Sequence, residues 1–564
     1  MANFFFDGTA NVTAAKSDNV LITANPALFT SEAQVGGNVV ITYTNGTTLT
    51  VTGASLADGS TALPGVQLAS GTFSSGSTAA ITSTTPNALI FAPNAGAGVI
   101  DVSGGGTATS IKTVFGGLGV SDPNDTADAI QIGGKGSFLV YGNAGADTIT
   151  QAGAAAGAFD STSFVTVFGG KNDAAGLQAD TITLANAGNL NAKFAVYGGE
   201  GTDTISVFNT GANANTAIFG GQGAADSLDS ADTITFNGGG TVNIFGNAGN
   251  DTINVGTGTA LDSTSNVTVH GGLGADGITI AAGGTAGGEI KVSITAFGDQ
   301  NDSTTGADSI TISGNGGSTT IYGGVSAADS ADGADVISFS GQGTTFIYAA
   351  GGNDTVVVNT AGTLSSAAGV VAGGTAVAAN SASVTNVFLG NGNDSINVLN
   401  ATADRGFTTV AGGAGNDSFG IGSTADSATL GAVGTGLTVT ITDFGTGNDT
   451  LQINNGVVNG PAAAGPPIVA TTSAPIAIAA PATAFGTLQA ALNAAASAGT
   501  GSANAAGTAG AVGVVVFNSD TYVVVNNSAA LVGGNAFDAA TDFAVKLTGV
   551  SQASAATAAL ITVV

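Results

Sequence analysis

The chain has 564 residues and a formal net charge of −29, although only 8% of its residues are charged. Of its 37 acidic residues, three are glutamates and 34 are aspartates, and eight residues are basic. So few basic residues exclude the positive surface that a nucleic-acid-binding protein requires. The absence of cysteine excludes disulfides, thiolate metal sites and cysteine catalysis. The excess of aspartate points instead to turns and to hard cations, which bind carboxylate oxygens.

The first 110 residues predict a β domain with a candidate anchoring role. They begin Met1-Ala2-Asn3 and continue without a basic segment or a long apolar run, so we expect no Sec-type signal peptide. Residues 39–51 alternate around Asn45-Gly46, which is typical of a β-hairpin.

Proline is absent from residues 124–460, where glycine is abundant. Because proline removes a backbone donor and is kept out of sheet interiors, this distribution predicts one continuous β structure. The repeat described next places the β-roll domain at 111–456.

A repeated loop fills this region. Its short form runs from Tyr141 to Asp147 and its long form inserts five to seven residues, as between Phe115 and Asp128. Thirteen loops end on an aspartate: Asp128, Asp147, Asp180, Asp203, Asp232, Asp251, Asp276, Asp308, Asp335, Asp354, Asp394, Asp417 and Asp449.

Alternating strands flank each loop. One follows the aspartate, as in Ile205 and Val207, and a second precedes the next loop, as in Val242 to Phe245. Each unit is therefore a coil of loop, strand, turn and strand, mostly 25 to 27 residues long. Stacked coils predict an all-β fold, a parallel β-roll or β-solenoid with its loops along one edge.

The loops resemble the glycine-rich nonapeptide of the RTX (hemolysin-type calcium-binding repeat) proteins. That resemblance implies a parallel β-roll that binds several Ca²⁺ ions and type I secretion through an uncleaved C-terminal signal. The family differs from this chain in two respects: it often has eighteen-residue coils, and it has calcium loops at both edges.

Calcium binding has a physical rationale in these loops. Calcium accepts six to eight oxygens, so neighbouring coils would share an ion. Glycine permits positive φ and lets carbonyl oxygens converge. The expected metal-site residues are the thirteen aspartates together with Gly142, Gly145, Gly198, Gly199, Gly201, Gly246, Gly249, Gly271, Gly272 and Gly274. The alternative is that the loops are only tight turns.

An aromatic residue precedes most glycine pairs, as in Phe168 and Tyr197, and His270 takes this position once. Alternation predicts that these rings point outward and stack about 4.8 Å apart. They would either stiffen the coil stack or form an exposed surface for assembly. A catalytic role for His270 is disfavoured by its repeat position. No catalytic constellation stands out, neither a Ser–Lys pair nor paired aspartates, so we predict that the protein is not an enzyme.

Residues 457–484 are rich in proline and alanine and predict a linker, so we expect no transmembrane segment there. Residues 485–564 predict a cap and secretion signal, with a helix over 485–496 and strands over 514–517 and 521–526. The end of 538–550 and the tail 559–564 resemble the final strands of RTX chains.

These features favour an extracellular structural protein that assembles with calcium, most simply a surface-layer protein of a Gram-negative bacterium. The expected partners are further copies of the chain and a cell-surface glycan or lipopolysaccharide. The alternatives are a secreted adhesin or biofilm-matrix filament and, least favoured, a secreted enzyme or toxin.

Overall fold

A computed structural model describes residues 2–563 in two compact units, residues 1–279 and 280–564. Gaps of one to four residues interrupt the description, and longer gaps fall at 57–62, 93–98, 153–158, 171–177, 283–292, 300–305, 360–383, 400–406, 423–438, 455–476, 479–486, 499–510, 527–542 and 549–560.

The first unit begins with two small sheets. One is parallel and contains β1 (Asn3–Phe6), β3 (Asn19–Ile22) and β7 (Val66–Leu68). The other contains β2 (Val12–Ala15), β6 (Thr48–Thr52), β5 (Asn38–Tyr43) and β4 (Phe29–Val35), and a 3-10 helix, η1, covers Pro26–Leu28. Strands β5 and β6 form the predicted hairpin, where Gly46 adopts a φ of +86° that glycine tolerates without strain.

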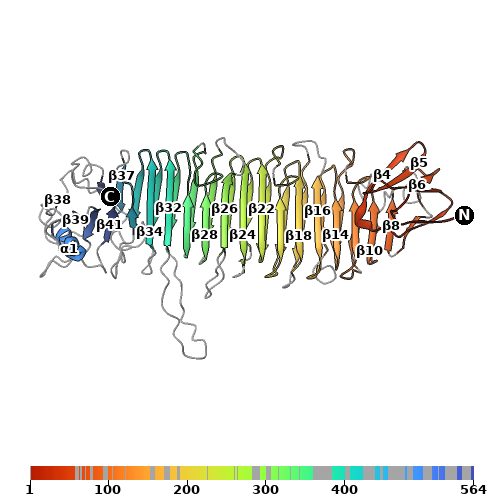
Figure 1. Ribbon diagram of the computed structural model, residues 1–564, viewed down its shortest axis with the longest axis horizontal. Coiled ribbons are helices and arrows are strands. Elements are labelled where there is room, and N and C mark those ends of the chain that lie inside the picture. The colour runs from red at the N-terminus through yellow and green to blue at the C-terminus, as the bar shows by residue number, and fades with distance from the viewer. Residues whose placement is uncertain are drawn as a thin grey trace, which may run out of the picture. The chain divides into compact units, whose positions relative to one another are not determined.

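Two parallel sheets then form the coils of the first unit (Figure 1). The sheet whose strands lead into the glycine loops contains β8 (Gly71–Ser75), β10 (Asn87–Phe91), β12 (Ile111–Phe115), β14 (Ser137–Tyr141), β16 (Phe164–Gly170), β18 (Lys193–Gly199), β20 (Asn215–Phe219), β22 (Thr241–Ala248) and β24 (Asn266–Leu273). The other sheet contains β9 (Ile81–Thr82), β11 (Val99–Ser103), β13 (Ala129–Gly133), β15 (Thr148–Gln151), β17 (Thr181–Asn186), β19 (Thr204–Asn209), β21 (Thr233–Gly238), β23 (Thr252–Val255) and β25 (Gly277–Ala281).

The second unit repeats this arrangement. Its loop-leading strands are β26 (Ser293–Asp299), β28 (Ser318–Tyr322), β30 (Thr344–Tyr348), β32 (Val384–Asn391), β34 (Phe407–Ala414) and β36 (Val439–Ile441). Its other strands are β27 (Ser309–Ser313), β29 (Val336–Ser340), β31 (Thr355–Asn359), β33 (Ser395–Leu399), β35 (Ser418–Gly422), β37 (Thr450–Asn454) and β42 (Ile561–Val563).

Alternation along the strands places one row of side chains between the two sheets. In β19, Ile205 and Val207 are buried while Ser206 between them is partly exposed, and Ile205 pairs in register with Ile182 and Ile234 of the adjacent coils. The predicted parallel β-roll or solenoid is therefore confirmed, and identical registers bring equivalent residues of successive coils together.

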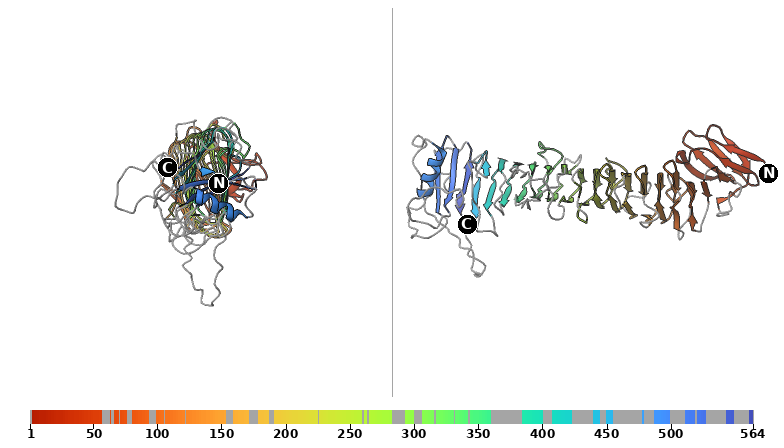
Figure 2. Two further views of the ribbon diagram at one scale, coloured as in Figure 1. Left: turned by 90° about the vertical axis from the view of Figure 1, so that its left-hand side faces the viewer. Right: turned by 90° about the horizontal axis from the view of Figure 1, so that it is seen from below.

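The C-terminal part adds a small antiparallel sheet of β39 (Ala511–Phe517), β40 (Asp520–Asn526) and β41 (Phe543–Leu547), with β38 (Ala477–Ile478) beside β39. Helix α1 (Leu488–Ala498) packs on it through Ala491 and Leu492, and Figure 2 shows the helix against these strands. The helix begins and ends slightly later than the sequence predicts. Most of the predicted linker lies outside the described residues.

Strands β41 and β42 also extend the coil sheets, because they pair in parallel with β36 and β37. No helix among the described residues is both long and apolar enough to cross a membrane.

The buried rows between the sheets make a direct prediction about stability. Replacing Ile205 with alanine should lower the free energy of unfolding by about 2–5 kcal/mol, because it removes fully buried methyl groups and leaves a cavity. Ser206→Ala on the same strand should change it by no more than about 0.5 kcal/mol. Urea denaturation followed by circular dichroism measures both, and equal effects would contradict the burial assigned to Ile205.

Candidate functional site

The loop aspartates form a buried column in each unit, at the start of the strands that follow the loops. The backbone N–H of Asp147 donates to Oδ1 of Asp180 on the next coil, while Oδ1 of Asp147 accepts the N–H of Asp128 on the preceding one, both at 2.7 Å. The same bond recurs at 2.7–2.8 Å from Asp128 to Asp276 and at 2.8–3.0 Å from Asp308 to Asp449. We call these two series the aspartate columns.

All thirteen predicted aspartates belong to the columns, and each is at most 4% exposed. The residue after each aspartate starts the strand, as Thr148 does by donating its N–H to the carbonyl of Asp128 at 2.8 Å. Each repeat aspartate therefore has two roles. Its backbone carbonyl binds the first residue of a strand, and its carboxylate binds the equivalent aspartate of the neighbouring coil.

The second carboxylate oxygen lies in a different environment. Oδ2 of Asp147 is buried without a hydrogen-bond partner and shares the space beside Gly142 with the carbonyl oxygen of Gly169 on the next coil. The buried Oδ2 atoms of Asp203 and Asp251 are in the same situation beside Gly198 and Gly246. Two buried acceptors side by side require a proton or a cation between them.

Burial raises the pKa of these carboxyl groups. Desolvation, with a contribution from Asp180, raises the pKa of Asp147 to about 10. Desolvation alone raises the pKa of Asp203 to about 6, and desolvation together with Asp229 raises that of Asp232 to about 11. In the absence of a cation, burial therefore favours the protonated form of these carboxyl groups.

The column oxygens fit a hard cation by their chemistry, because carboxylate and backbone carbonyl oxygens are the ligands that calcium prefers. Among the described residues, no group of three or more His, Cys, Asp or Glu side chains is arranged to hold a metal ion. The residues that would hold an ion at the column are the Oδ2 atoms of the aspartates and the neighbouring glycine carbonyl oxygens, as at Asp147 and Gly169.

The predicted glycines divide into two kinds. Positive φ occurs at Gly145, Gly199, Gly201, Gly249, Gly272 and Gly274, as expected. Gly142, Gly198 and Gly246 are required for space instead, since a Cβ at each would collide with a column Oδ2 and a carbonyl oxygen of the next coil. Gly271 lies in β24, and its carbonyl oxygen is the one beside Gly246.

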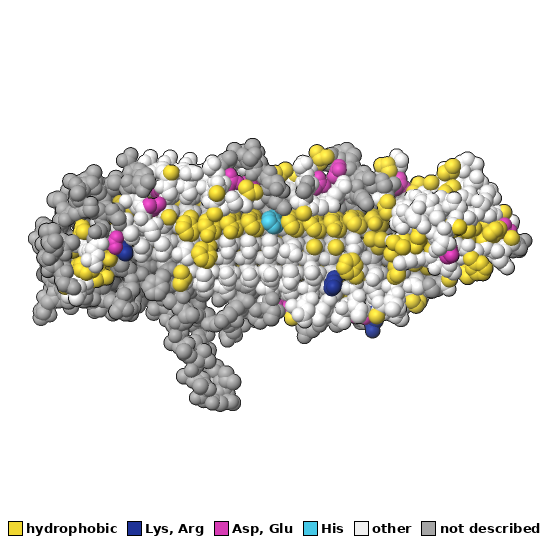
Figure 3. All heavy atoms as spheres, viewed as in Figure 1, with side chains coloured by type: hydrophobic (Ala, Val, Ile, Leu, Met, Phe, Trp, Pro, Cys, Tyr) yellow, Lys and Arg dark blue, Asp and Glu magenta, His cyan; other side chains and the backbone are white. Residues whose placement is uncertain are grey.

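The aromatic residues form a stacked stripe in each unit, visible as the yellow row in Figure 3. Successive rings lie 4.6–5.2 Å apart and within 12° of parallel, from Phe91 to His270 in the first unit and from Phe297 to Phe388 in the second. The predicted stacking is confirmed. Most of the rings are partly exposed, whereas the residues two positions before the glycine pair, such as Val167 and Val196, are buried.

The first rings of the stripe are not exposed to solvent. Phe115 is fully buried and Tyr141 is 8% exposed, because the N-terminal sheets pack over them in one core with Phe6, Phe29 and Tyr43. These rings still lie on the opposite strand face from the buried Val114 and Val140, as alternation predicts, but they contact the N-terminal sheets instead of solvent.

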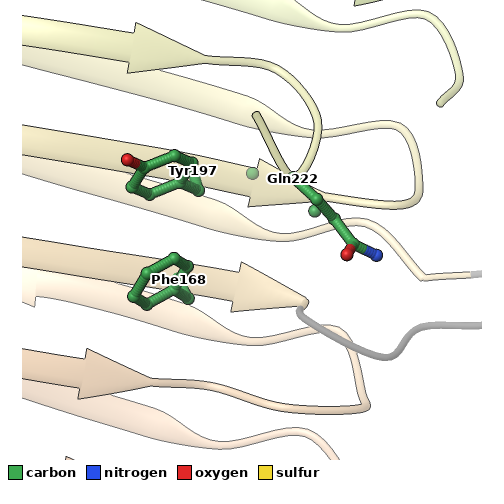
Figure 4. Close-up of a pocket in the computed structure, with 5 residues that line it drawn as sticks. Phe168, Tyr197 and Gln222 are labelled. Carbon is green, nitrogen blue, oxygen red and sulfur yellow. The ribbon is translucent and has the colours of Figure 1, made fainter. Parts of the chain in front are cut away.

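His270 stacks on Phe245 at 4.8 Å, and burial lowers its pKa to about 4. The imidazole is thus neutral at neutral pH and occupies the position of an aromatic ring. Beside the stripe, Phe168, Tyr197 and Gln222 line a small depression, with Gln222 in the loop beyond the strand ends (Figure 4).

Two groups of polar residues escaped the sequence analysis. Lys112 is fully buried between the coil sheets, where its Nζ donates to the carbonyls of Val102 and Gly104. It lies on the same strand face as the buried Val114, and this alternation is a signal that could have been detected. The long-form loops carry further aspartates before the column residue, and their regular spacing is a signal that could have been detected.

No protein-family model matches the chain, and no curated protein or solved structure is significantly similar to it.

The raised pKa values predict the pH dependence of stability without calcium. Between about pH 4 and the folded-state pKa values, the folded columns hold protons that the unfolded chain has lost, so stability should fall as the pH rises. In EDTA, the melting temperature by circular dichroism should be lower at about pH 9 than at about pH 5, and calcium should restore it at the higher pH. A melting temperature in EDTA that stays constant or rises would refute the protonated column.

Substitutions of one column residue, Asp203, distinguish the roles of its two carboxylate oxygens. Asp203→Ala leaves the buried N–H of Asp180 without its acceptor, which should cost about 1–3 kcal/mol. Asp203→Asn keeps the Oδ1 acceptor and offers an amide donor toward the carbonyl of Gly220, so in EDTA it should be at least as stable as the parent chain. Urea denaturation of the two variants tests this, and a larger loss in the asparagine variant would be inconsistent with the assigned bonds.

Proposed function

We propose that this protein is an extracellular structural protein whose coils are ordered by calcium and which self-assembles, as a surface-layer protein of a Gram-negative bacterium does. The observation that carries this proposal is the aspartate column. It places buried carboxylate oxygens beside carbonyl oxygens on coil after coil, which is an arrangement that a divalent cation would stabilise.

The columns make folding and ion binding interdependent. An ion that neutralises an Oδ2 on one coil and contacts a carbonyl of the next would favour the stacked state over the unfolded chain. In the calcium-poor cell interior, the chain awaiting export would then lack the ions that favour stacking. In the calcium-rich exterior, bound ions would favour the stacked coils and their assembly. The resemblance to RTX repeats supports the same view and adds type I secretion to the proposal.

The aromatic stripe supports assembly. Phe168, Tyr197, Phe219 and Phe245 form a continuous row of partly exposed rings in the first unit, and Phe388 in the second is 41% exposed. A linear apolar row with so few charges offers a self-complementary contact for a second copy of the chain. The same linear geometry also suits a matrix filament or adhesin, which is the alternative within this proposal.

Assembly should depend on both calcium and the stripe. On titration of calcium into the EDTA-treated chain, light scattering should rise and negative-stain electron microscopy should show sheets. Phe219→Ser combined with Phe245→Ser should greatly reduce this assembly, because it removes adjacent rings of the stripe.

Phe164→Ser is the matched control, since Phe164 is 49% exposed but lies outside the stripe. It should assemble like the parent chain, and circular dichroism verifies that all variants are folded. Fibres instead of sheets would favour the filament, and monomers at saturating calcium would rule out both forms of assembly.

A further inference from the structure

Three long-form loops share an acidic spacing that the aspartate columns do not explain. Each carries two aspartates, three and six residues before its column residue, so that the sequence reads Asp-x-x-Asp-x-x-Asp. The additional residues are Asp122 and Asp125, Asp226 and Asp229, and Asp329 and Asp332.

In the second of these loops, three side chains converge on one point beside Gly221. A Cβ on Gly221 would lie 2.6 Å from Oδ2 of Asp229, 2.8 Å from Oδ2 of Asp226 and 2.7 Å from Nδ2 of Asn247. The N–H of Gln222 donates to Oδ2 of Asp226 at 2.9 Å, and Figure 4 shows this glutamine in the loop beyond the strand ends. Glycine at this position thus leaves a cradle of polar atoms open.

Asn247 is the observation that indicates a ligand. It belongs to the next coil, is only 4% exposed, and has no hydrogen-bond partner for either amide atom in the described structure. A buried amide with both polar atoms unsatisfied costs free energy unless a ligand satisfies it. A half-turn of the amide exchanges its nitrogen and oxygen, so it can present an oxygen to the cradle.

The first long loop repeats this arrangement. A Cβ on Gly117 would lie 2.7 Å from Oδ2 of both Asp122 and Asp125, and the N–H of Leu118 donates to Oδ2 of Asp122 at 2.9 Å. Asn143 of the next coil occupies the position of Asn247, is fully buried, and also leaves both amide atoms without a hydrogen-bond partner in the described structure.

The third loop keeps the two aspartates but lacks the asparagine of the next coil. Its cradle lies beside Gly324, with Oδ2 of Asp332 at 2.5 Å and Oδ2 of Asp329 at 3.0 Å from the Cβ position. Ala350 replaces the asparagine on the next coil and adopts nearly the same φ, +83° against +86° for Asn247. The carboxyl of Asp299, from the preceding coil, adjoins Asp332 instead.

We propose that the first two acidic loops are calcium sites that adjoin the aspartate columns and add to them, each formed by two loop aspartates and the buried asparagine of the following coil. One site uses Asp122, Asp125 and Asn143, and the other uses Asp226, Asp229 and Asn247. This proposal rests on the proposed function in taking calcium as the ion.

The chemistry of the ligands selects the ion class. Carboxylate, amide and backbone carbonyl oxygens on a surface loop suit calcium, which tolerates irregular geometry and takes six to eight oxygens, better than magnesium, which requires a near-ideal octahedron. Asp226 and Asp229 are partly exposed, so an ion can reach them from solvent. Because ligands come from two consecutive coils, a bound ion would clamp a long loop onto its neighbour.

Equilibrium dialysis of the purified full chain against calcium, with magnesium as competitor, tests these sites by stoichiometry. Gly221→Ala fills the cradle without changing any charge, whereas Gly223→Ala in the same loop is the matched control, because a Cβ there meets nothing within 4 Å. Gly221→Ala should bind one calcium ion fewer than the parent chain, and Gly223→Ala should bind the full number.

Asn247→Ala provides a second variant that retains the fold, since Ala350 already occupies the equivalent position. It should weaken binding at one site, and adding Asn143→Ala should weaken it at a second. Unchanged stoichiometry and affinity in both Gly221→Ala and Asn247→Ala would overturn the loop sites, even if calcium still drove assembly. Loss of one ion in these variants, with assembly independent of calcium, would uphold the loop sites and reject the proposed function.

Discussion

The fold depends on one recurring hydrogen bond, from the backbone N–H of a column aspartate to the carboxylate Oδ1 of the equivalent aspartate on the next coil. The bond brings an ionisable group into the interior of every coil and leaves its second oxygen beside a backbone carbonyl. The glycines follow from this constraint, because a side chain at Gly142 or Gly198 would occupy the space of that oxygen. Register, loop composition and strand start are thus consequences of the same contact.

The column also changes how the charge of −29 is understood. Thirteen carboxyl groups are buried in the columns, and burial without a compensating proton or cation disfavours their ionised form. Raised pKa values at Asp147 and Asp232 describe the protonated state. In the proposed function, calcium would compete with protons for the same oxygens, so the stability of the coils would depend on both calcium and pH.

Stacked aromatic rings reinforce the coil repeat on the surface side. The N-terminal sheets cover the first rings, since Phe6 and Phe29 share a core with Phe115 and Tyr141. From Phe168 onward in the first unit, the rings are partly exposed. The same rings are therefore both stacked within the chain and partly exposed, and the proposed assembly uses the uncovered rings.

The sequence by itself determined the coil: loop periodicity fixed the repeat, alternation of Ile205 and Val207 fixed the buried face, and Asn45-Gly46 fixed a hairpin. These are local signals, because strand alternation and turn chemistry act over a few residues. Only the tertiary structure decided what the aspartates contact, which carbonyls the buried Lys112 binds, that Phe115 is covered and that Asn247 lies beside Asp229 of the preceding coil. Those contacts join residues that are far apart in the sequence. Which residues meet depends on the register in which consecutive coils stack.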